Sequence, residues 1–190
     1  VLVTNGDFEA TGWGAFVDYW WWSGAASEVY FNIVNGEMEV DIVQPGGAGW
    51  AIQPNQVVEV EYNELENVSY KVTFDAYADA ERTINAFAGY QRASHNSWHP
   101  YGGMENVALT TVKQTFEYMI VVTEDNGPDN VELKFEAGGN DVNFYFDNVT
   151  LIEWDTVNDV AVGENLIVNG TFDKVLDWET WSITGLFWPE

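Results

Sequence analysis

Two pairs of side chains in this sequence have types and spacings that could do chemistry. Glu132 and Glu136 are carboxylates four positions apart, and His95 and His99 are imidazoles at the same spacing. Carboxylate pairs that cleave glycosidic bonds stand about 5 to 9 Å apart, but four residues along a strand span roughly 13 Å. A zinc site would need both histidines on one helix face, whereas the Asn-Ser-Trp between them and the Pro100 after them indicate a loop. We therefore expect no catalytic pair and two solvated histidines.

The chain is also rich in aromatic side chains, which can bind ligands by stacking. It contains 10 tryptophans, 9 tyrosines and 11 phenylalanines. Flat rings stack on the apolar C–H faces of sugars, and amide or carboxylate groups hydrogen-bond the hydroxyl groups. In the run Trp20-Trp21-Trp22, strand alternation places Trp20 and Trp22 on one face, with at least one ring in the core. Any single tryptophan has a packing role as readily as a ligand contact, so the hypothesis rests on the whole set.

Composition excludes several classes of partner and site. The 31 acidic and 6 basic residues give a formal charge of −25, which repels phosphate backbones and anionic lipids. We therefore expect no nucleic-acid and no membrane partner, and no run approaches the roughly 18 apolar residues of a membrane helix. The absence of cysteine excludes disulfides and thiolate zinc sites. The acidity fits either a neutral ligand or a cation, or solubility in a salty medium, and both alternatives stay open.

Short alternating runs separated by turn residues must position these side chains, and they predict an all-β sandwich or jelly roll. Asn35-Gly36 is a strong signal for a type I′ hairpin turn. Strand-like runs occupy 29–34, 36–43, 70–78, 84–90, 115–122, 131–136 and 142–152. One face of the run 70–78 should be core, and it comprises Tyr70, Val72, Phe74, Ala76 and Ala78.

The same alternation selects the side chains that should point away from the core. The residues expected to line one outward face are Asp75, Tyr77, Asn85, Phe87, Gln91, Glu132, Lys134 and Glu136. The segment 91–103 carries Trp98 and Tyr101, and we expect it to form a loop that makes a wall beside that face.

An internal repeat predicts the domain organisation. The segment 2–9, Leu-Val-Thr-Asn-Gly-Asp-Phe-Glu, recurs at 166–173 as Leu-Ile-Val-Asn-Gly-Thr-Phe-Asp. We expect one module at 1–153, a polar acidic linker at 154–163 and the N-terminal fragment of a second, similar module at 164–190. The fragment lacks the strands that would bury Leu166, Ile167 and Phe172, so residues from about 154 onward should be mobile or docked on the first module. The first residues show no leader pattern, so any export signal has already been removed.

Several local patterns together resemble the carbohydrate-binding modules of family 4 and its relatives in families 9, 16 and 22. The patterns are Asn-Gly-Asp-Phe-Glu at 5–9, Asn-Gly-Glu at 35–37, Trp-Ala-Ile-Gln at 50–53, the run 70–78 and Phe-Tyr-Phe-Asp-Asn-Val-Thr-Leu at 144–151. The resemblance implies a galactose-binding-like jelly roll of two antiparallel sheets with a concave ligand-binding face. It places Trp50 and Gln53 beside that face, and Asn85, Glu132 and Glu136 at positions where relatives carry hydrogen-bonding groups.

The resemblance also implies a structural calcium ion. Ca²⁺ takes six to eight hard oxygen ligands from carboxylates and carbonyls. Carried over to this sequence, the carboxylates are those of Glu9 and Asp147, with carbonyls from around Gly6 and Glu37. The other reading is that Asn-Gly simply makes a turn and Asp147 faces solvent.

The leading hypothesis is a secreted or cell-surface, monomeric, non-catalytic module that binds a neutral polysaccharide and targets an attached glycoside hydrolase to it. The expected ligand is a β-1,3-glucan such as laminarin, then mixed-linkage glucan or xylan. The alternatives are a calcium-stiffened adhesion or spacer domain and a jelly-roll enzyme acting on glycans. The candidate glycan-binding residues are Trp20, Trp50, Gln53, Tyr77, Asn85, Gln91, Trp98, Tyr101, Glu132 and Glu136.

Overall fold

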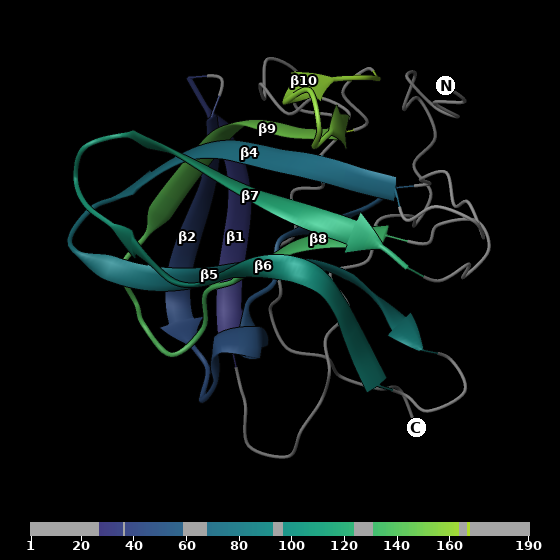
Figure 1. Cartoon of the computed structure of the whole chain (residues 1–190). Helices are drawn as coiled ribbons and strands as arrows, with labels where there is room; N and C mark the ends of the chain where they lie inside the picture. The colour runs from purple at the N-terminus through teal and green to yellow at the C-terminus, as the bar shows by residue number, and fades with distance from the viewer. Residues whose placement is uncertain are drawn as a thin grey trace, which may run out of the picture.

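The described part of the chain forms two antiparallel sheets packed face to face (Figure 1). The computed structural model describes residues 27–35, 37–58, 68–92, 97–123, 131–163 and 167. Sheet A contains, in spatial order, β1 (Ser27–Val34), β2 (Glu37–Pro45), β9 (Phe144–Asp155), β4 (Val68–Ala78) and β7 (Gln114–Val122), with β10 (Val160–Ala161) paired to β9. Sheet B contains β3 (Asn55–Val58), β8 (Val131–Glu136), β5 (Arg82–Arg92) and β6 (Ser97–Leu109). This confirms the predicted all-β jelly-roll sandwich.

The local turn and strand signals were also right. Val34 pairs with Glu37 across a two-residue loop, and Asn35 has a φ of 55°, the left-handed conformation that a type I′ turn requires. Each of the seven predicted runs lies in or overlaps a strand. Among the described residues, the one helical segment is the short 3₁₀ helix η1 (Gly49–Ala51), so none is long and apolar enough to span a membrane.

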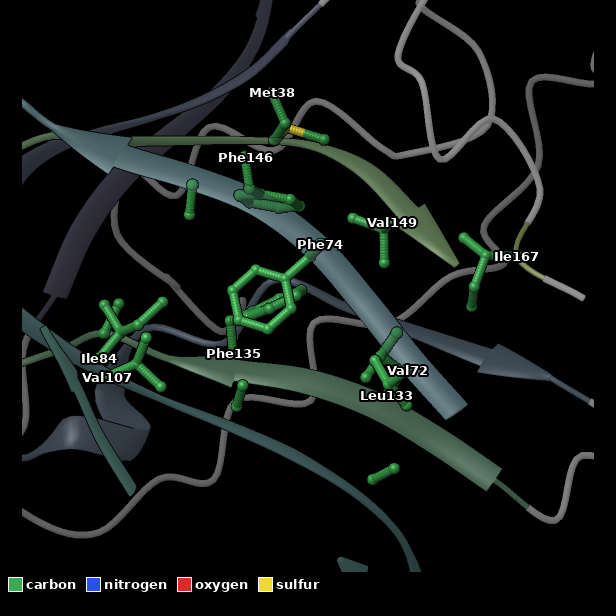
Figure 2. Close-up of a cluster of buried hydrophobic side chains, with 14 of the residues drawn as sticks. Met38, Val72, Phe74, Ile84, Val107, Leu133, Phe135, Phe146, Val149 and Ile167 are labelled. Atoms are coloured by element: carbon green, nitrogen blue, oxygen red, sulfur yellow. The ribbon is translucent and has the colours of Figure 1, made fainter. Parts of the chain in front are cut away.

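The core lies between the two sheets and comes from one face of each strand (Figure 2). All five side chains predicted as the core face of the run 70–78 are buried. Phe74 of sheet A meets Phe135 of sheet B edge to face at 5.0 Å between ring centroids, and Phe135 lies 4.9 Å from Phe146. Truncating such a buried phenylalanine costs about 3–5 kcal/mol, so this contact between the sheets is a main source of stability.

Three segments differ from the sequence-based expectations. β3 was not predicted, because a four-residue strand with Asn and Gln shows little apolar alternation. Most of 91–103, expected as a loop, lies in the paired strands β5 and β6, whose register shifts twice. The segment expected as a linker begins inside β9 at Trp154 and contains β10. The division into a first module and a second fragment stays a prediction.

Candidate functional site

The outward face of sheet B gathers many of the predicted site residues. Ala86 and Ala88 of β5 and Leu133 and Phe135 of β8 belong to the core cluster, so their neighbours along each strand point away from the core. Register then sets the rows across this face, which we call face B. One row comprises Asn55, Lys134, Phe87 and Gly103, the next pairs Glu136 with Asn85, and a third places Gly89 between Glu132 and Pro100.

Two aromatic rings lie across glycines on face B. A Cβ placed at Gly89 would stand 2.8 Å from Cζ2 of Trp98, and one placed at Gly103 would overlap Cδ1 of Phe87. Trp98 comes from β6, yet its ring centroid lies 3.7 Å from Nζ of Lys134 in β8. The indole therefore reaches over β5, which runs between those two strands. The glycines leave room for the rings to lie close to the sheet.

Lys134 links the aromatic part of face B to its polar part. Its side chain is only 8% exposed, and Nζ lies 3.3 Å from Oε1 of Glu136. The same oxygen accepts a hydrogen bond from Nε2 of Gln53 at 3.3 Å. A buried ammonium must be paired or stacked, and here it is both. Glu136 thereby fixes the position of the cation below the Trp98 ring.

Backbone pairing between two loops brings Gln53 to Glu136. The N–H groups of Ala137, Gly138 and Gly139 donate to the carbonyls of Ile52, Gly49 and Pro45 at 2.7 to 3.0 Å. These bonds hold the segment that contains Trp50 and Gln53 against the end of β8.

Arg82 supports this corner from inside the molecule. Its guanidinium donates to the carbonyls of Ala137 and Val142 and stacks 5.0 Å from the ring of Phe144. Burial lowers the pKa of Arg82 to about 10, while Asp141 opposes the shift. The buried arginine therefore fixes both ends of the loop that follows Glu136.

Face B contains further polar groups. Oδ1 of Asn85 accepts from the backbone N–H of Asn106 at 2.9 Å, where β6 bulges and Asn106 has a φ of 54°. Glu132 is half-buried at the other end of β8. Asn55 was not among the predicted residues. Its side chain donates to the carbonyl of Gln53 at 3.2 Å. The sequence signal that could have identified it is a polar side chain two positions after Gln53.

The structure moves three predicted residues away from face B. Asp75 and Tyr77 lie on β4, which belongs to sheet A, so the expectation that they share a face with Asn85 is wrong. Tyr101 lies in a strand rather than a loop and packs partly against the core, 5.4 Å from Tyr90. His99 contacts both tyrosine rings and is half-buried rather than solvated. The bulge in β6 next to Gly89 shifts the alternation there.

Some predicted positions have limited or no description. Trp50 is half-buried in η1, next to Gly49, which approaches Oε2 of Glu136. Gln91 pairs with Trp98 through the backbone, but its side chain lies outside the described residues. Trp20 and His95 also lie outside them.

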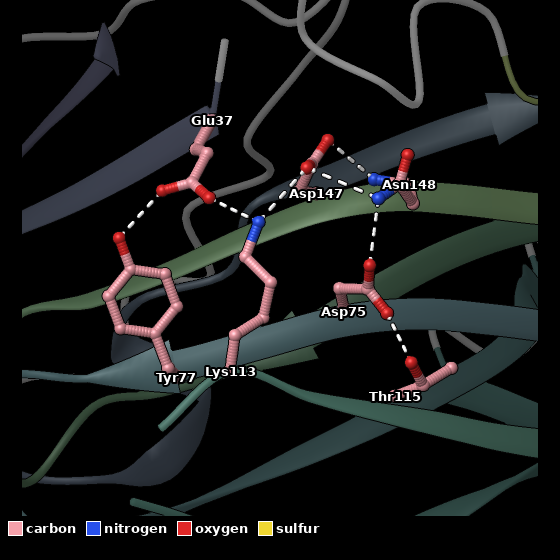
Figure 3. A network of polar contacts seen from close by, with 7 residues as sticks. All are labelled: Glu37, Asp75, Tyr77, Lys113, Thr115, Asp147 and Asn148. Atoms are coloured by element: carbon pink, nitrogen blue, oxygen red, sulfur yellow. Dashed lines mark hydrogen bonds and ion pairs between the residues drawn. The ribbon is translucent and has the colours of Figure 1, made fainter. Parts of the chain in front are cut away.

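The outward face of sheet A, which we call face A, carries a different arrangement of aromatic and charged groups (Figure 3). The rings of Tyr77 and Tyr145 stack on each other at 4.7 Å and 12°. The Tyr77 hydroxyl donates to Oε2 of Glu37 at 2.6 Å, and the Tyr145 hydroxyl donates to Oε1 of Glu39 at 3.1 Å. Burial and the bond to Glu37 raise the pKa of Tyr77 to about 12, and burial and Glu39 raise that of Tyr145 further.

Face A contains Glu37 and Asp147, two of the four residues implied at the calcium site (Figure 3). The ammonium of Lys113 contacts the carboxylates of Glu37 and Asp147, at 3.2 Å from Oδ2 of Asp147, whereas the resemblance implies a backbone carbonyl near Glu37 as the calcium ligand. These bonds raise the pKa of Lys113, Glu37 having the larger effect. Within the described ranges, no group of three or more His, Asp or Glu side chains is arranged to hold a metal. Gly6 and Glu9, the other two implied ligands, lie outside those ranges.

Face B therefore combines rings that can stack on a sugar with amides and carboxylates that can hydrogen-bond its hydroxyl groups. Glu132 and Glu136 are too far apart along one strand to form a catalytic carboxylate pair. Glu136 is in addition engaged by Lys134 and Gln53. The geometry favours recognition of a ligand over chemical attack on it.

Comparison with known proteins agrees with this geometry. The model of the CBM_4_9 family, described as a carbohydrate binding domain, matches residues 1–159. A solved structure described as "CBM4 structure and function" is 28% identical, with a TM-score of 0.59, and the match covers 70% of this chain and 81% of that one. No curated protein matches the chain.

Two further similar structures come from Cellulomonas fimi β-1,4-glucanase C. Its second N-terminal cellulose-binding domain is 19% identical with a TM-score of 0.54, covering 70% of this chain and 86% of that one. Its N-terminal cellulose-binding domain is 14% identical with a TM-score of 0.51, covering 68% and 89%. At these identities the likeness shows a shared fold. Because the family model spans most of the chain, the chain belongs to the CBM_4_9 family of carbohydrate-binding domains.

Proposed function

We propose that face B binds a neutral polysaccharide without cleaving it, and that the module is a secreted monomer that targets an attached glycoside hydrolase to that polysaccharide. Binding keeps a linked enzyme near its substrate and so raises the effective substrate concentration. A β-1,3-glucan is the first candidate, followed by mixed-linkage glucan and xylan.

The observation that carries the proposal is the Trp98 ring over Gly89. A half-exposed indole that extends along the sheet offers a flat surface for a sugar ring. Face B also carries the row of Asn85 and Glu136, and the Glu136 carboxylate is bonded to Gln53 and to the Lys134 ammonium below the indole. Such polar groups fix the orientation of a ligand that stacking alone leaves free to rotate.

Charge supports a neutral ligand. Glu132 and Glu136 point from face B, and the whole chain carries a formal charge of −25. An anionic glycan would be repelled unless a bound cation bridged it to the protein. Among the described residues of face B, the ammonium is that of Lys134, which is already paired with Glu136.

Affinity gel electrophoresis against laminarin, mixed-linkage glucan, xylan and soluble cellulose derivatives tests the proposal. We expect laminarin to retard the protein most strongly. Trp98→Ala should remove about 1 kcal/mol or more of binding free energy, which is at least about fivefold in affinity, with little change in melting temperature. The matched control is Tyr77→Ala, which removes an aromatic residue from face A and should leave retardation unchanged.

The outcomes separate three kinds of protein. Retardation without released sugar, lost in Trp98→Ala, supports the binding module. Released sugar would identify an enzyme. Absence of retardation with every glycan would point to an adhesion or spacer domain, and equal loss in both variants would mean that face B is not the binding surface.

We also propose that a calcium ion stabilises the module on face A, held by Glu37 and Asp147 together with Gly6 and Glu9. The convergence of Glu37 and Asp147 supports this, and the ion would displace the Lys113 ammonium that now bridges them. Calcium added to chelator-treated protein should raise the melting temperature, and Asp147→Asn should abolish the rise. An unchanged melting temperature in the original protein would contradict the proposal.

A further inference from the structure

Only one of the two carboxylate oxygens of Glu136 has a partner within the described residues. Oε1 lies 3.3 Å from the ammonium of Lys134 and accepts from the side-chain amide of Gln53 at the same distance. Oε2 has no such partner, yet it is not buried, because the buried side-chain polar atoms without a partner in that part of the chain are Nε of Arg82 and the Tyr118 hydroxyl. Oε2 is therefore an accessible hydrogen-bond acceptor on face B.

The glycines in the two loops beside Glu136 have different surroundings. A Cβ placed at Gly138 would stand 2.1 Å from the carbonyl oxygen of Ala48, so close packing of the loops requires glycine there. A Cβ placed at Gly47 would meet nothing within 4 Å. Among the described residues, a Cβ placed at Gly49 would meet only Oε2 of Glu136, at 4.0 Å. Packing of the loops therefore does not explain glycine at position 49, whereas access to Oε2 does.

The backbone of Gly49 is held in place and does not require glycine either. Its carbonyl accepts from the N–H of Gly138 at 2.7 Å. In the described ranges, the glycines with left-handed φ are Gly46 and Gly139. Position 49 is not one of them, so alanine or valine can adopt its backbone conformation. The main change that such a side chain makes is to fill the space in front of Oε2 of Glu136.

We propose that Gly49 is a specificity-determining residue of face B, because it leaves room for a hydroxyl group of the glycan to donate to Oε2 of Glu136. This inference rests on the proposed glycan-binding function and adds the chemistry of one contact. Lys134 and Gln53 occupy Oε1, so Oε2 remains for the ligand. A hydrogen bond to a charged acceptor is about twice as strong as one between neutral groups. The same oxygen repels an anionic group, so the contact selects a neutral donor.

Binding isotherms of a graded series at position 49 test the proposal. The probe is laminarin, or mixed-linkage glucan or xylan if one of these binds more tightly. Gly49→Ala should weaken binding about twofold and Gly49→Val about tenfold, because the larger side chain covers more of Oε2. Gly47→Val is the matched control in the same loop and should bind like the original protein. Equal affinity of Gly49→Val and the original protein, or an equal loss in Gly47→Val, would overturn the proposal.

A double-mutant cycle with Glu136→Gln shows whether position 49 acts through Oε2. In this variant the amide oxygen must face Lys134 and Gln53, because both are donors, so an NH₂ group replaces Oε2. Glu136→Gln alone should weaken binding about tenfold, and Gly49→Val should then have little further effect. Additive losses would contradict the proposal, since the valine would then act on another group such as Trp50.

The same isotherms distinguish failure of this contact from failure of the proposed function. If the original protein binds none of the glycans, glycan binding and this contact are both wrong. If Trp98→Ala loses binding while Gly49→Val and Glu136→Gln keep it, face B binds the glycan but Oε2 of Glu136 does not contact it. Melting temperatures of all variants identify any loss of binding that follows from unfolding, and in that case Gly49→Ala replaces Gly49→Val in the cycle.

Discussion

Face A and face B contain similar residue types but use them in opposite ways. On face A, Tyr77 and Tyr145 stack on each other, and each hydroxyl is bonded to a glutamate. On face B, Trp98 and Phe87 lie over glycines instead of over other rings. An aromatic residue on an outer sheet face is thus available to a ligand only through a ring face that its neighbours leave uncovered. The availability of such a ring to a ligand therefore depends on the glycine beneath it as much as on the ring itself.

The two faces also differ in how they hold a lysine. Lys134 on face B is nearly buried between Trp98 and Glu136, whereas the side chain of Lys113 on face A is 39% exposed between Glu37 and Asp147. Exposed ion pairs contribute little to stability, but a buried charge without its partner is costly. The lysines therefore provide a direct comparison of the two faces.

The largest effect should come from filling the space below Trp98. A Cβ at Gly89 would also overlap the backbone of His99 and Pro100, so Gly89→Val should lower the free energy of unfolding by about 1–3 kcal/mol and abolish glycan binding. Denaturant titration and affinity gels measure the two effects. Gly47→Val is the control, because a Cβ there meets nothing within 4 Å. An equal effect at both glycines would show that the space under the ring is unimportant.

The two lysines should give a smaller, asymmetric result. Lys134→Met leaves Glu136 without its ammonium and should cost about 1–3 kcal/mol of unfolding free energy, with weaker glycan binding because Trp98 loses the cation beside it. Lys113→Met should cost less than about 1 kcal/mol and leave binding unchanged in calcium-free buffer. Denaturant melts and binding isotherms of the pair check this. Weaker binding in Lys113→Met would mean that the faces are coupled.

The smallest effect should appear at alkaline pH on face A. The pKa of Tyr77 is raised from 10.0 to about 12, so the unfolded chain loses this proton first. The contribution of this pKa difference to the free energy of unfolding is complete below pH 10 and is lost as the pH rises toward 12. The fall in melting temperature over that range should be smaller in Tyr77→Phe, which keeps the ring. An identical pH profile in both proteins would contradict this role for the hydroxyl.

Much of the fold and part of the site could be predicted from the sequence. Strict alternation in 70–78 and 131–136 specified which side chains enter the core between the sheets, since strand geometry sends neighbours to opposite faces. The same rule correctly placed Asn85, Phe87, Lys134 and Glu136 on one outward surface. The turn at Asn35 followed from its tolerance of positive φ.

The remaining features depended on contacts between distant segments. Alternation states which way Tyr77 points relative to its own strand but not which sheet that strand joins, because sheet membership is set by long-range pairing. The contact of Gln53 with Glu136 required two loops to pair, and the burial of Ile167 required a residue far along the chain to join the core cluster of the sandwich. The sequence by itself determined a surplus of aromatic residues and their strand faces. The tertiary structure alone decided that glycines lie beneath Trp98 and Phe87 and that tyrosine stacks on tyrosine, since those partners come from different strands.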